Sequence, residues 1–386
     1  MLDLDKTTWK RVKFSDAVKN VNTKSSNPAS DGIDRVIAME HLDPGKLAVR
    51  GWGTLESGTT FTRRVTPGQT LFGKRRAYQR KVAFAEFDAI CSGDILTFEA
   101  IPGMMLPEFL PFVVQSDPFF ERAVGTSAGS LSPRTNWRDL AKFEFDLPRL
   151  DEQKRIADLL WAVERHRNAL TGRSEAAAIC RTSLVESRLS SLDSSLSLAQ
   201  VAEISSGVTL SPRRRELETT APYLRVANVQ RGALDLSEVK EVGATSSEVV
   251  SKGVRQGDVL VVEGHASVEE IGRAAVWDRE DSPLFQNHIF RVRASEGFRP
   301  RFILEWINSA SGRAYIRTVA KSTSGLYTIN STVLKLMPVP DAPQAYQDAL
   351  LEELERFDYS AACEAKDRFA TAELQSSLLA SVFGDS

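Results

Sequence analysis

The sequence predicts a mixed α/β (α+β) fold in which two globular domains are arranged in tandem duplication, each followed by a long helix. Three observations carry this prediction: segments that recur about 190 residues apart, two long stretches with helical periodicity, and short β-branched runs bounded by Gly and Pro. The chain has 386 residues, enough for two or more domains that each bury a core.

The repeated segments keep the same order in both halves of the chain. FLPF (109–112) corresponds to FILE (302–305), and each is followed by a segment rich in Ser, Thr and Gly. The further corresponding pairs are GTSAGSLS (125–132) with KSTSGLYT (321–328), FEFDLP (143–148) with LMPVP (336–340), PGQTLF (67–72) with QGDVLV (256–261), and RVIAMEHLDPGKL (35–47) with PYLRVANVQRGAL (222–234). A duplicated chain is therefore expected to build one scaffold twice.

The repeat sets the expected domain boundaries. We predict a first globular domain over 1–150, a helix over 151–195, a second globular domain over 196–340 and a second helix over 341–386. Within the globular domains, GDVLVVEG and HIFRVR have the composition of strands. EFLPFVVQSDPFFERAV (108–124) and its counterpart 301–316 are expected to be helical, the first broken near Asp117-Pro118.

The first long helix, from Asp151 to about Leu192, contains no proline and would extend on the order of 60 Å. Its apolar residues recur every seven positions, as in a coiled coil: Ile156, Val163, Leu170, Ala177 and Leu184. The second helix has an apolar line in which four residues step by eleven, which predicts a nearly straight or slightly right-handed path: Leu350, Ala361, Ala372 and Phe383. We expect the two helices to pair as an antiparallel coiled coil; the alternative is two separate helices, each packed on its own domain.

Composition excludes several classes of protein. The start, MLDLDKTTWK, lacks a signal peptide, and no run approaches 18 apolar residues, so we expect no membrane segment. Three widely spaced cysteines (Cys91, Cys180 and Cys363) predict no disulfide framework and favour a reducing, cytoplasmic location. The net charge of −2 favours no particular partner by itself.

Signals for catalysis fail on mechanism. GQTLFGK (68–74) matches most of a phosphate-binding loop, but Arg75 stands where a Ser or Thr must bind magnesium. The four histidines are scattered without a ligand partner three or four residues away, so no metal site is expected. No nucleophile motif, methyltransferase motif or Gly-rich cofactor loop is present, and we predict a protein without catalytic residues.

Local charge indicates an anionic partner instead. Seven basic residues and no acid lie between Arg63 and Lys81, although a solvated charged face remains the alternative. Lys and Arg neutralise phosphates, and Arg or Gln can also bind base edges. The candidate residues in the first domain are Lys74, Arg75, Arg76, Tyr78, Arg80 and Lys81.

The second domain offers fewer charges and more amides at the matching place. Its candidates are Glu263, His265, Arg273, Gln286 and Asn287, with Arg213, Arg214 and Arg215 for phosphates. A turn before a strand is the structural alternative for Gln286 and Asn287. The Ser/Gly loops 126–132 and 322–327 are weaker candidates, because such stretches are usually only turns.

Taken together, these motifs resemble the specificity (S) subunit of type I restriction-modification systems over essentially the whole chain. The resemblance is carried by PGQTLFGKRRAYQRKVAFAEFDAICSGD (67–94), GDVLVVEGHASVEEIGRAAVW (257–277), QNHIFRVR (286–293) and LPRLDEQKRIADLL (147–160). The second copy departs from the pattern at its strand-to-helix junction, where VPDAPQAYQDALL (339–351) lacks the Glu-Gln pair of the first copy.

The resemblance implies two target-recognition domains that each bind one half of a bipartite site in double-stranded DNA. It implies that the paired helices fix the spacer and dock two methyltransferase (M) subunits. S-adenosylmethionine, ATP and Mg²⁺ would be bound by the partner subunits, including restriction (R) subunits where present, and none by this chain. The expected location is the cytoplasm of a bacterium or archaeon.

Two rival functions remain open from the sequence alone. One is a stand-alone DNA-binding regulator, which would need no methyltransferase partner. The other is a coiled-coil scaffold that binds only protein, its basic segments being solvated surface.

Overall fold

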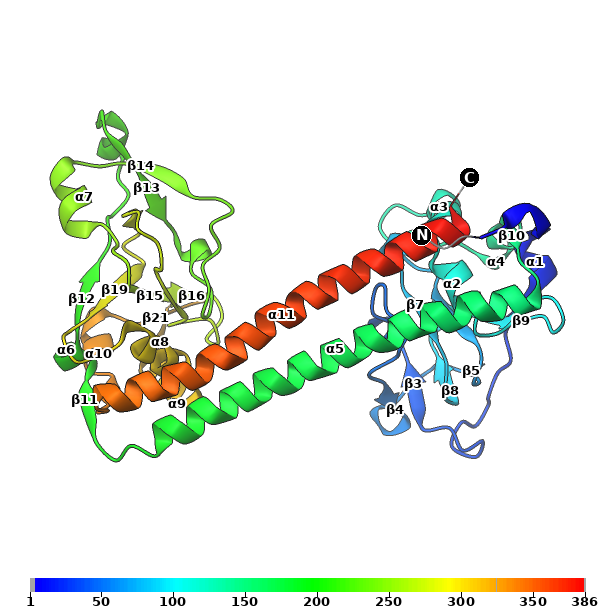
Figure 1. The fold of residues 1–386 in the computed structure, drawn as a ribbon, viewed down its shortest axis with the longest axis horizontal. Coiled ribbons are helices and arrows are strands. Elements are labelled where there is room, and N and C mark those ends of the chain that lie inside the picture. Colours follow the sequence, from blue (N-terminus) through cyan, green and yellow to red (C-terminus); the bar gives the residue numbers. More distant parts are fainter. Residues whose placement is uncertain (1–3, 324, 385–386) are drawn as a thin grey trace. The chain divides into compact units, whose positions relative to one another are not determined.

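The computed structural model describes residues 4–323 and 325–384, which form two compact units. Unit 1 comprises Met1–Arg173 with Glu364–Ser386, and unit 2 comprises Ser174–Cys363. Both long helices, α5 (Leu150–Ser190) and α11 (Gln344–Phe383), therefore contribute to both units (Figure 1). The domain boundaries expected at residues 150, 195 and 340 stay a prediction, because each compact unit combines one globular part with segments of both helices.

Unit 1 contains two four-stranded sheets. The first has the order β2 (Val18–Val21), β9 (Ile95–Ala100), β6 (Thr70–Gly73) and β7 (Val82–Phe84), all antiparallel. The second has the order β4 (Gly53–Thr54), β3 (Arg35–Ile37), β8 (Ala89–Cys91) and β5 (Arg63–Val65), with β3 and β8 parallel. The remaining elements are β1 (Lys10–Lys13) paired with β10 (Glu144–Leu147), and the helices α1 (Phe14–Ala17), α2 (Leu110–Gln115), α3 (Asp117–Gly125) and α4 (Trp137–Leu140).

Unit 2 repeats this plan. Its main sheet has the order β12 (Ala202–Ser206), β19 (Ile289–Ala294), β15 (Val259–Val262) and β17 (Ala274–Val276), and a second has β14 (Lys240–Gly243), β13 (Thr220–Leu224) and β18 (Leu284–Phe285). A third sheet contains β16 (Gly264–His265), β21 (Leu326–Thr328) and β20 (Lys321–Thr323). The others are β11 (Ser195–Ser197) with β22 (Pro338–Pro340), α6 (Leu198–Val201), α7 (Ser246–Lys252), α8 (Pro300–Asn308), α9 (Ala310–Val319) and α10 (Ser331–Lys335).

A single serine interrupts the paired short helices in both units. Ser116 separates α2 from α3, and Ser309 separates α8 from α9; both are extended and cap the second helix through their side chains. The predicted break near Asp117-Pro118 is thus confirmed, and its cause is a serine N-cap that satisfies an otherwise unpaired amide.

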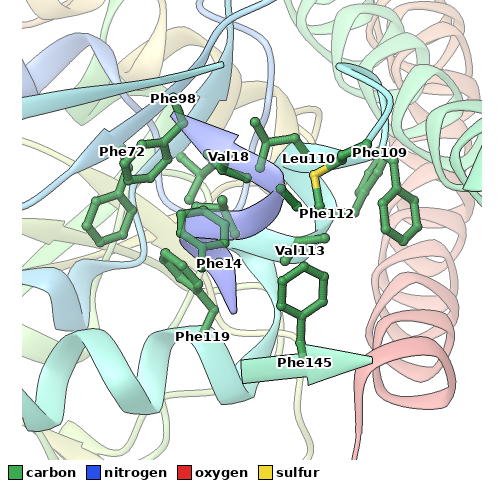
Figure 2. Close-up of a cluster of buried hydrophobic side chains, with 14 of the residues drawn as sticks. Phe14, Val18, Phe72, Phe98, Phe109, Leu110, Phe112, Val113, Phe119 and Phe145 are labelled. Carbon is green, nitrogen blue, oxygen red and sulfur yellow. The ribbon is translucent and has the colours of Figure 1, made fainter. Parts of the chain in front are cut away.

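Aromatic packing supplies much of the core of unit 1 (Figure 2). The Phe14 ring lies 5.4 Å from the Phe98 ring and 5.0 Å from the Phe119 ring, and all three side chains are fully buried. Burial of each such side chain contributes about 1.5–3 kcal/mol. The end of α11 joins this core, because Leu378 and Val382 are buried in the same cluster.

A buried glutamine fixes each long helix to its globular part. Gln153, in the first turn of α5, accepts a hydrogen bond from the Leu106 amide (2.9 Å). Its side-chain amide donates to the carbonyl oxygens of Met104 and Pro148, both at 2.9 Å. The Gln153 side chain is fully buried, so three backbone polar groups depend on it.

Gln347 makes the equivalent bonds in unit 2. It accepts from the Arg299 amide (2.7 Å) and donates to Gly297 (3.0 Å) and Ala342 (2.8 Å), and it is also fully buried. The second copy therefore keeps the glutamine in the first turn of its helix, although the preceding glutamate of the first copy is missing.

Within each unit, α5 and α11 run antiparallel. In unit 1, Arg167 hydrogen-bonds Gln375 and Arg173 bonds Glu364 at 3.0 Å. In unit 2, Arg181 bonds Asp358 at 2.9 Å and Arg188 bonds Glu353. The partner number falls as the α5 number rises, and this confirms the predicted antiparallel pairing.

The apolar line predicted for α11 is confirmed at its ends, where Leu350 is buried and Phe383 is half-buried, and is wrong in the middle. Ala361 and Ala372 are exposed, whereas the polar residues Glu364, Thr371 and Gln375 are buried. Leu350, Glu364, Thr371 and Leu378 differ in number by multiples of seven, so a heptad spacing holds in α11 too. In α5 the predicted heptad line is buried at Ile156, Val163 and Leu170 and half-buried at Ala177 and Leu184.

Replacing Gln153 or Gln347 with Leu is expected to lower the free energy of unfolding of the affected unit by about 3 kcal/mol. The reason is that a buried N–H and two carbonyl groups lose their partners. Denaturant unfolding measures the loss. Gln344→Leu, at the exposed first residue of α11, is the matched control and should change stability by less than about 0.5 kcal/mol. Equal stability of all three variants would contradict the conclusion that Gln153 and Gln347 fix the long helices to their globular parts.

Candidate nucleic-acid interface

The basic segment of unit 1 is the turn of a hairpin between β6 and β7. Residues 74–81 do not continue the strand, so their side chains do not alternate between two faces. Arg76 (φ 53°) and Arg80 (φ 54°) adopt the left-handed conformation on either side of a short 3₁₀ helix, Ala77–Gln79. Each such residue costs about 1–3 kcal/mol. The backbone of this turn is therefore strained, and strained backbone of this kind is common at functional sites.

Four cations gather at the start of this turn, and two of them pair with one carboxylate. Arg134 Nε lies 3.0 Å from Asp94 Oδ1, and Arg75 Nη1 lies 3.7 Å from Asp94 Oδ2. Burial lowers the pKa of Lys74, and the nearby charges of Arg63 and Arg134 lower it further. We call Arg63, Lys74, Arg75 and Arg134 the cationic cluster. Its uncompensated positive charge attracts an anion.

A second hairpin, which includes a loop predicted only as a weaker candidate, supports the cationic cluster. The backbone of Arg134 forms bridges to both Arg75 and Ala128. Arg75 Nε donates to Ser132 Oγ at 2.6 Å, and the Arg76 amide donates to the Pro133 carbonyl at 2.7 Å. The Ser/Gly loop 126–132 thus belongs to the same surface as the basic turn. Arg134 was missed because it follows that loop as a single charge.

Other candidates in the turn have internal partners. Arg80 Nη2 lies 2.6 Å from Asp117 Oδ1 and 2.9 Å from the Gln115 carbonyl, while its guanidinium lies 4.5 Å from the centre of the Phe120 ring. Lys81 Nζ donates to the Met39 carbonyl at 2.7 Å. These two residues hold the turn against the rest of unit 1. Arg76 and Tyr78 are exposed and remain available.

Unit 2 builds the equivalent surface with different side chains. His265 lies in β16 and pairs with Tyr327 of β21, one residue beyond the Gly264–Thr328 pair that corresponds to Arg75 and Arg134 in unit 1. Its Nδ1 accepts from the Ser267 amide at 3.0 Å. Of the second Ser/Gly loop, 322–327, Ser324 lies outside the described residues.

Glu263 forms the polar centre of this surface. Its Oε2 lies 2.7 Å from Nδ1 of His288, an exposed histidine that directly follows the candidates Gln286 and Asn287. Gln286 and Asn287 form a turn before β19, the structural alternative to DNA binding, with backbone bonds to Leu224 (2.9 Å) and Val208 (3.0 Å). Both side chains are half-buried.

A cavity of about 400 Å³ opens at the same place. Glu263, His288, Lys321 and Asn330 give it polar groups, and Leu326 and Val333 give it apolar ones.

Two predicted arginines serve the fold instead. Arg273 is buried, with bonds to Glu270 (3.2 Å) and to the Val226 carbonyl (3.1 Å), so it cannot reach a duplex on the surface. Arg214 binds both oxygens of Glu248, at 2.6 and 3.1 Å. This pairing lowers the pKa of Glu248 to about 2.

The neighbours of Arg214 differ from it. Arg213 and Arg215 are exposed and, among the described residues, make no ion pair or side-chain hydrogen bond.

Two further findings concern residues 4–323 and 325–384 only. No helix there is sufficiently long and apolar to cross a membrane. In the same residues, no group of three or more His, Cys, Asp or Glu side chains could hold a metal ion.

Comparison with known proteins finds similarity to one family over part of the chain. Residues 20–178 match the model of the type I restriction modification DNA specificity domain. The chain is 25% identical over 180 residues to the EcoKI specificity subunit of Escherichia coli K12, covering 45% of this chain and 39% of that protein. It is 27% identical over 150 residues to the Escherichia coli EcoDI specificity subunit, covering 38% and 33%. The matched part thus spans well under half of either relative.

Solved structures share the fold along almost the whole chain. A chain from a structure of type I R-M system complex assembly and conformational transition has a TM-score of 0.59 at 15% identity, covering 97% of each chain. The type I S subunit of M. genitalium has a TM-score of 0.56 at 13% identity, covering 100% of this chain and 99% of that one. The chain is thus similar to type I restriction-modification specificity subunits, through the family match over residues 20–178 and the two relatives of known function.

Proposed function

We propose that this chain is the DNA-recognition and scaffold subunit of a type I restriction-modification complex. The observation that carries the proposal is the cationic cluster of unit 1, whose four basic side chains include only two, Arg75 and Arg134, that pair with a carboxylate, Asp94. Such a cluster binds the phosphates of a duplex and releases counterions. Phosphate contacts position the subunit, and neighbouring side chains then recognise base edges.

Each unit recognises one half of a bipartite site. The support is the duplicated scaffold: the same hairpin surface carries Arg75 and Arg134 in unit 1 but His265, Glu263 and His288 in unit 2. A basic surface favours guanine edges and phosphates, whereas a carboxylate accepts from the amino groups of cytosine or adenine. Different polar side chains on one scaffold therefore suit two different half-sites.

The two long helices fix the spacer and dock two M subunits, with R subunits joining where present. The support is that each helix is one continuous element whose residues belong to both units. Catalysis and its cofactors, S-adenosylmethionine, ATP and Mg²⁺, belong to those partners, and this chain has a non-catalytic role.

Arg75→Gln and Arg134→Gln are each expected to weaken binding to duplexes of any sequence. Each lost phosphate contact should reduce the slope of log K against log salt concentration by about one. Fluorescence anisotropy at several salt concentrations measures it. Arg11→Gln is the control, because Arg11 lies near both Glu144 and Asp146 and leaves no net positive charge. An unchanged slope in both cluster variants would rule out the cationic cluster as a phosphate site.

The three adjacent arginines of unit 2 should separate into two kinds. Arg213→Gln with Arg215→Gln should lower DNA affinity and its salt dependence without changing stability. Arg214→Gln should instead lower stability at neutral pH. Its effect should vanish on acidification, because the folded pKa of Glu248 is about 2 against an ordinary 4.5. Stability from the pair is therefore complete above about pH 4.5 and is lost as pH falls toward 2. DNA binding lost only in Arg214→Gln would reverse this assignment.

Removing seven residues from each long helix should shorten the recognised spacer by about three base pairs. Seven helical residues span about 10 Å, and one base pair rises about 3.4 Å. Sequencing of methylated adenines, in cells that also carry the cognate M subunit, gives the spacer directly. An unchanged spacer would refute the ruler role, and failure of the unaltered chain to co-migrate with the M subunit in size exclusion would refute docking.

A further inference from the structure

Both hairpin surfaces carry an exposed leucine in or beside the hairpin turn. Leu131 lies in the turn that joins Ala128 to Arg134, and its exposed fraction is 90%. Leu326 lies beside the turn that joins β20 to β21, where it pairs with Thr323, and its exposed fraction is 43%. A single exposed apolar residue is ordinary on a protein surface. Here it recurs on two hairpins whose polar residues differ.

The turn that carries Leu131 is fixed to its surroundings. Arg75 holds Ser132, the next residue, through a 2.6 Å hydrogen bond. The Pro133 carbonyl accepts from the Arg76 amide at 2.7 Å, and the Arg134 backbone bridges Ala128. Arg75 and Arg134, two members of the cationic cluster, thus hold the turn that carries Leu131. A partner whose phosphates reach this cluster also reaches Leu131.

The surroundings of Leu326 are polar on one side and apolar on the other. Leu326 lines the 400 Å³ cavity together with Glu263, His288 and Lys321. Lys321 starts the paired strand β20. The leucine is therefore next to groups that can bind both phosphate oxygens and base edges.

We propose that Leu131 and Leu326 each make an apolar contact with a base of the half-site that their unit recognises. The inference rests on the proposed function and adds the type of contact. A duplex offers apolar surface in two ways: the C5-methyl group of thymine in the major groove, or the face of a base at an opened step. Both place the leucine against a base, while the neighbouring cations bind phosphates.

The test measures affinity of the complete chain for a duplex whose site has been mapped by methylated-adenine sequencing. Leu131→Ala is expected to weaken binding about tenfold, from the lost apolar contact, with no change for a duplex lacking the site. Leu326→Ala should act in the same way through the other half-site. Leu336→Ala, at an exposed leucine beyond α10, is the control and should bind as the unaltered chain does.

Two duplex modifications distinguish the sources of apolar surface. Replacing thymine by deoxyuridine removes the methyl group; if the methyl is the contact, the unaltered chain weakens and the Ala variant does not weaken further. A 2-aminopurine in the site brightens on unstacking; if an opened step is the contact, the brightening disappears in the Ala variant. Either result supports the proposal.

Three results would overturn it. Unchanged affinity of both Ala variants for the mapped site would rule out the proposed contact with a base. Equal weakening on the mapped and unrelated duplexes shows a general effect on the hairpin instead of base contact. No preference of the unaltered chain for any mapped site overturns the proposed function itself, and this inference with it.

Discussion

The buried amide in the first turn of each long helix is the constraint on which the rest of the architecture depends. Gln153 and Gln347 each satisfy one N–H and two carbonyl groups that have no water to replace them. These bonds set where each helix leaves its globular part. The hairpin surface of a unit consequently keeps a fixed place relative to the helices of that unit, which loops on a flexible junction would not provide.

Much of the fold could be predicted from sequence, because a repeat and apolar periodicity are visible without coordinates. The duplicated order, the broken short helices and the antiparallel helix pair all followed from such patterns. The seam of α11 did not, because Glu364, Thr371 and Gln375 are buried although polar. Periodicity of apolar residues carries no information about a polar residue whose partner, such as Arg173 for Glu364, lies on another helix.

The site was harder to predict, since charge in a sequence does not show whether it is already neutralised. Arg80 and Arg214 looked like Arg75, yet Asp117 and Glu248 neutralise them from segments more than thirty residues away. Conversely, Arg134 is a single charge after a Ser/Gly loop, and His288 is a single histidine at the start of a strand. Strand pairing brings them to the site, and no local pattern encodes which strands pair.

The composition of the two units has a consequence for the order of folding. Unit 2 is one continuous segment, Ser174–Cys363, whereas unit 1 needs Glu364 and the residues beyond it. Leu378 and Val382 complete the core that Phe14 and Phe98 begin. During synthesis, domains generally fold from the N-terminal end onward. Here unit 1 is synthesised first, but its core cannot be completed until the final turns of α11 have been synthesised.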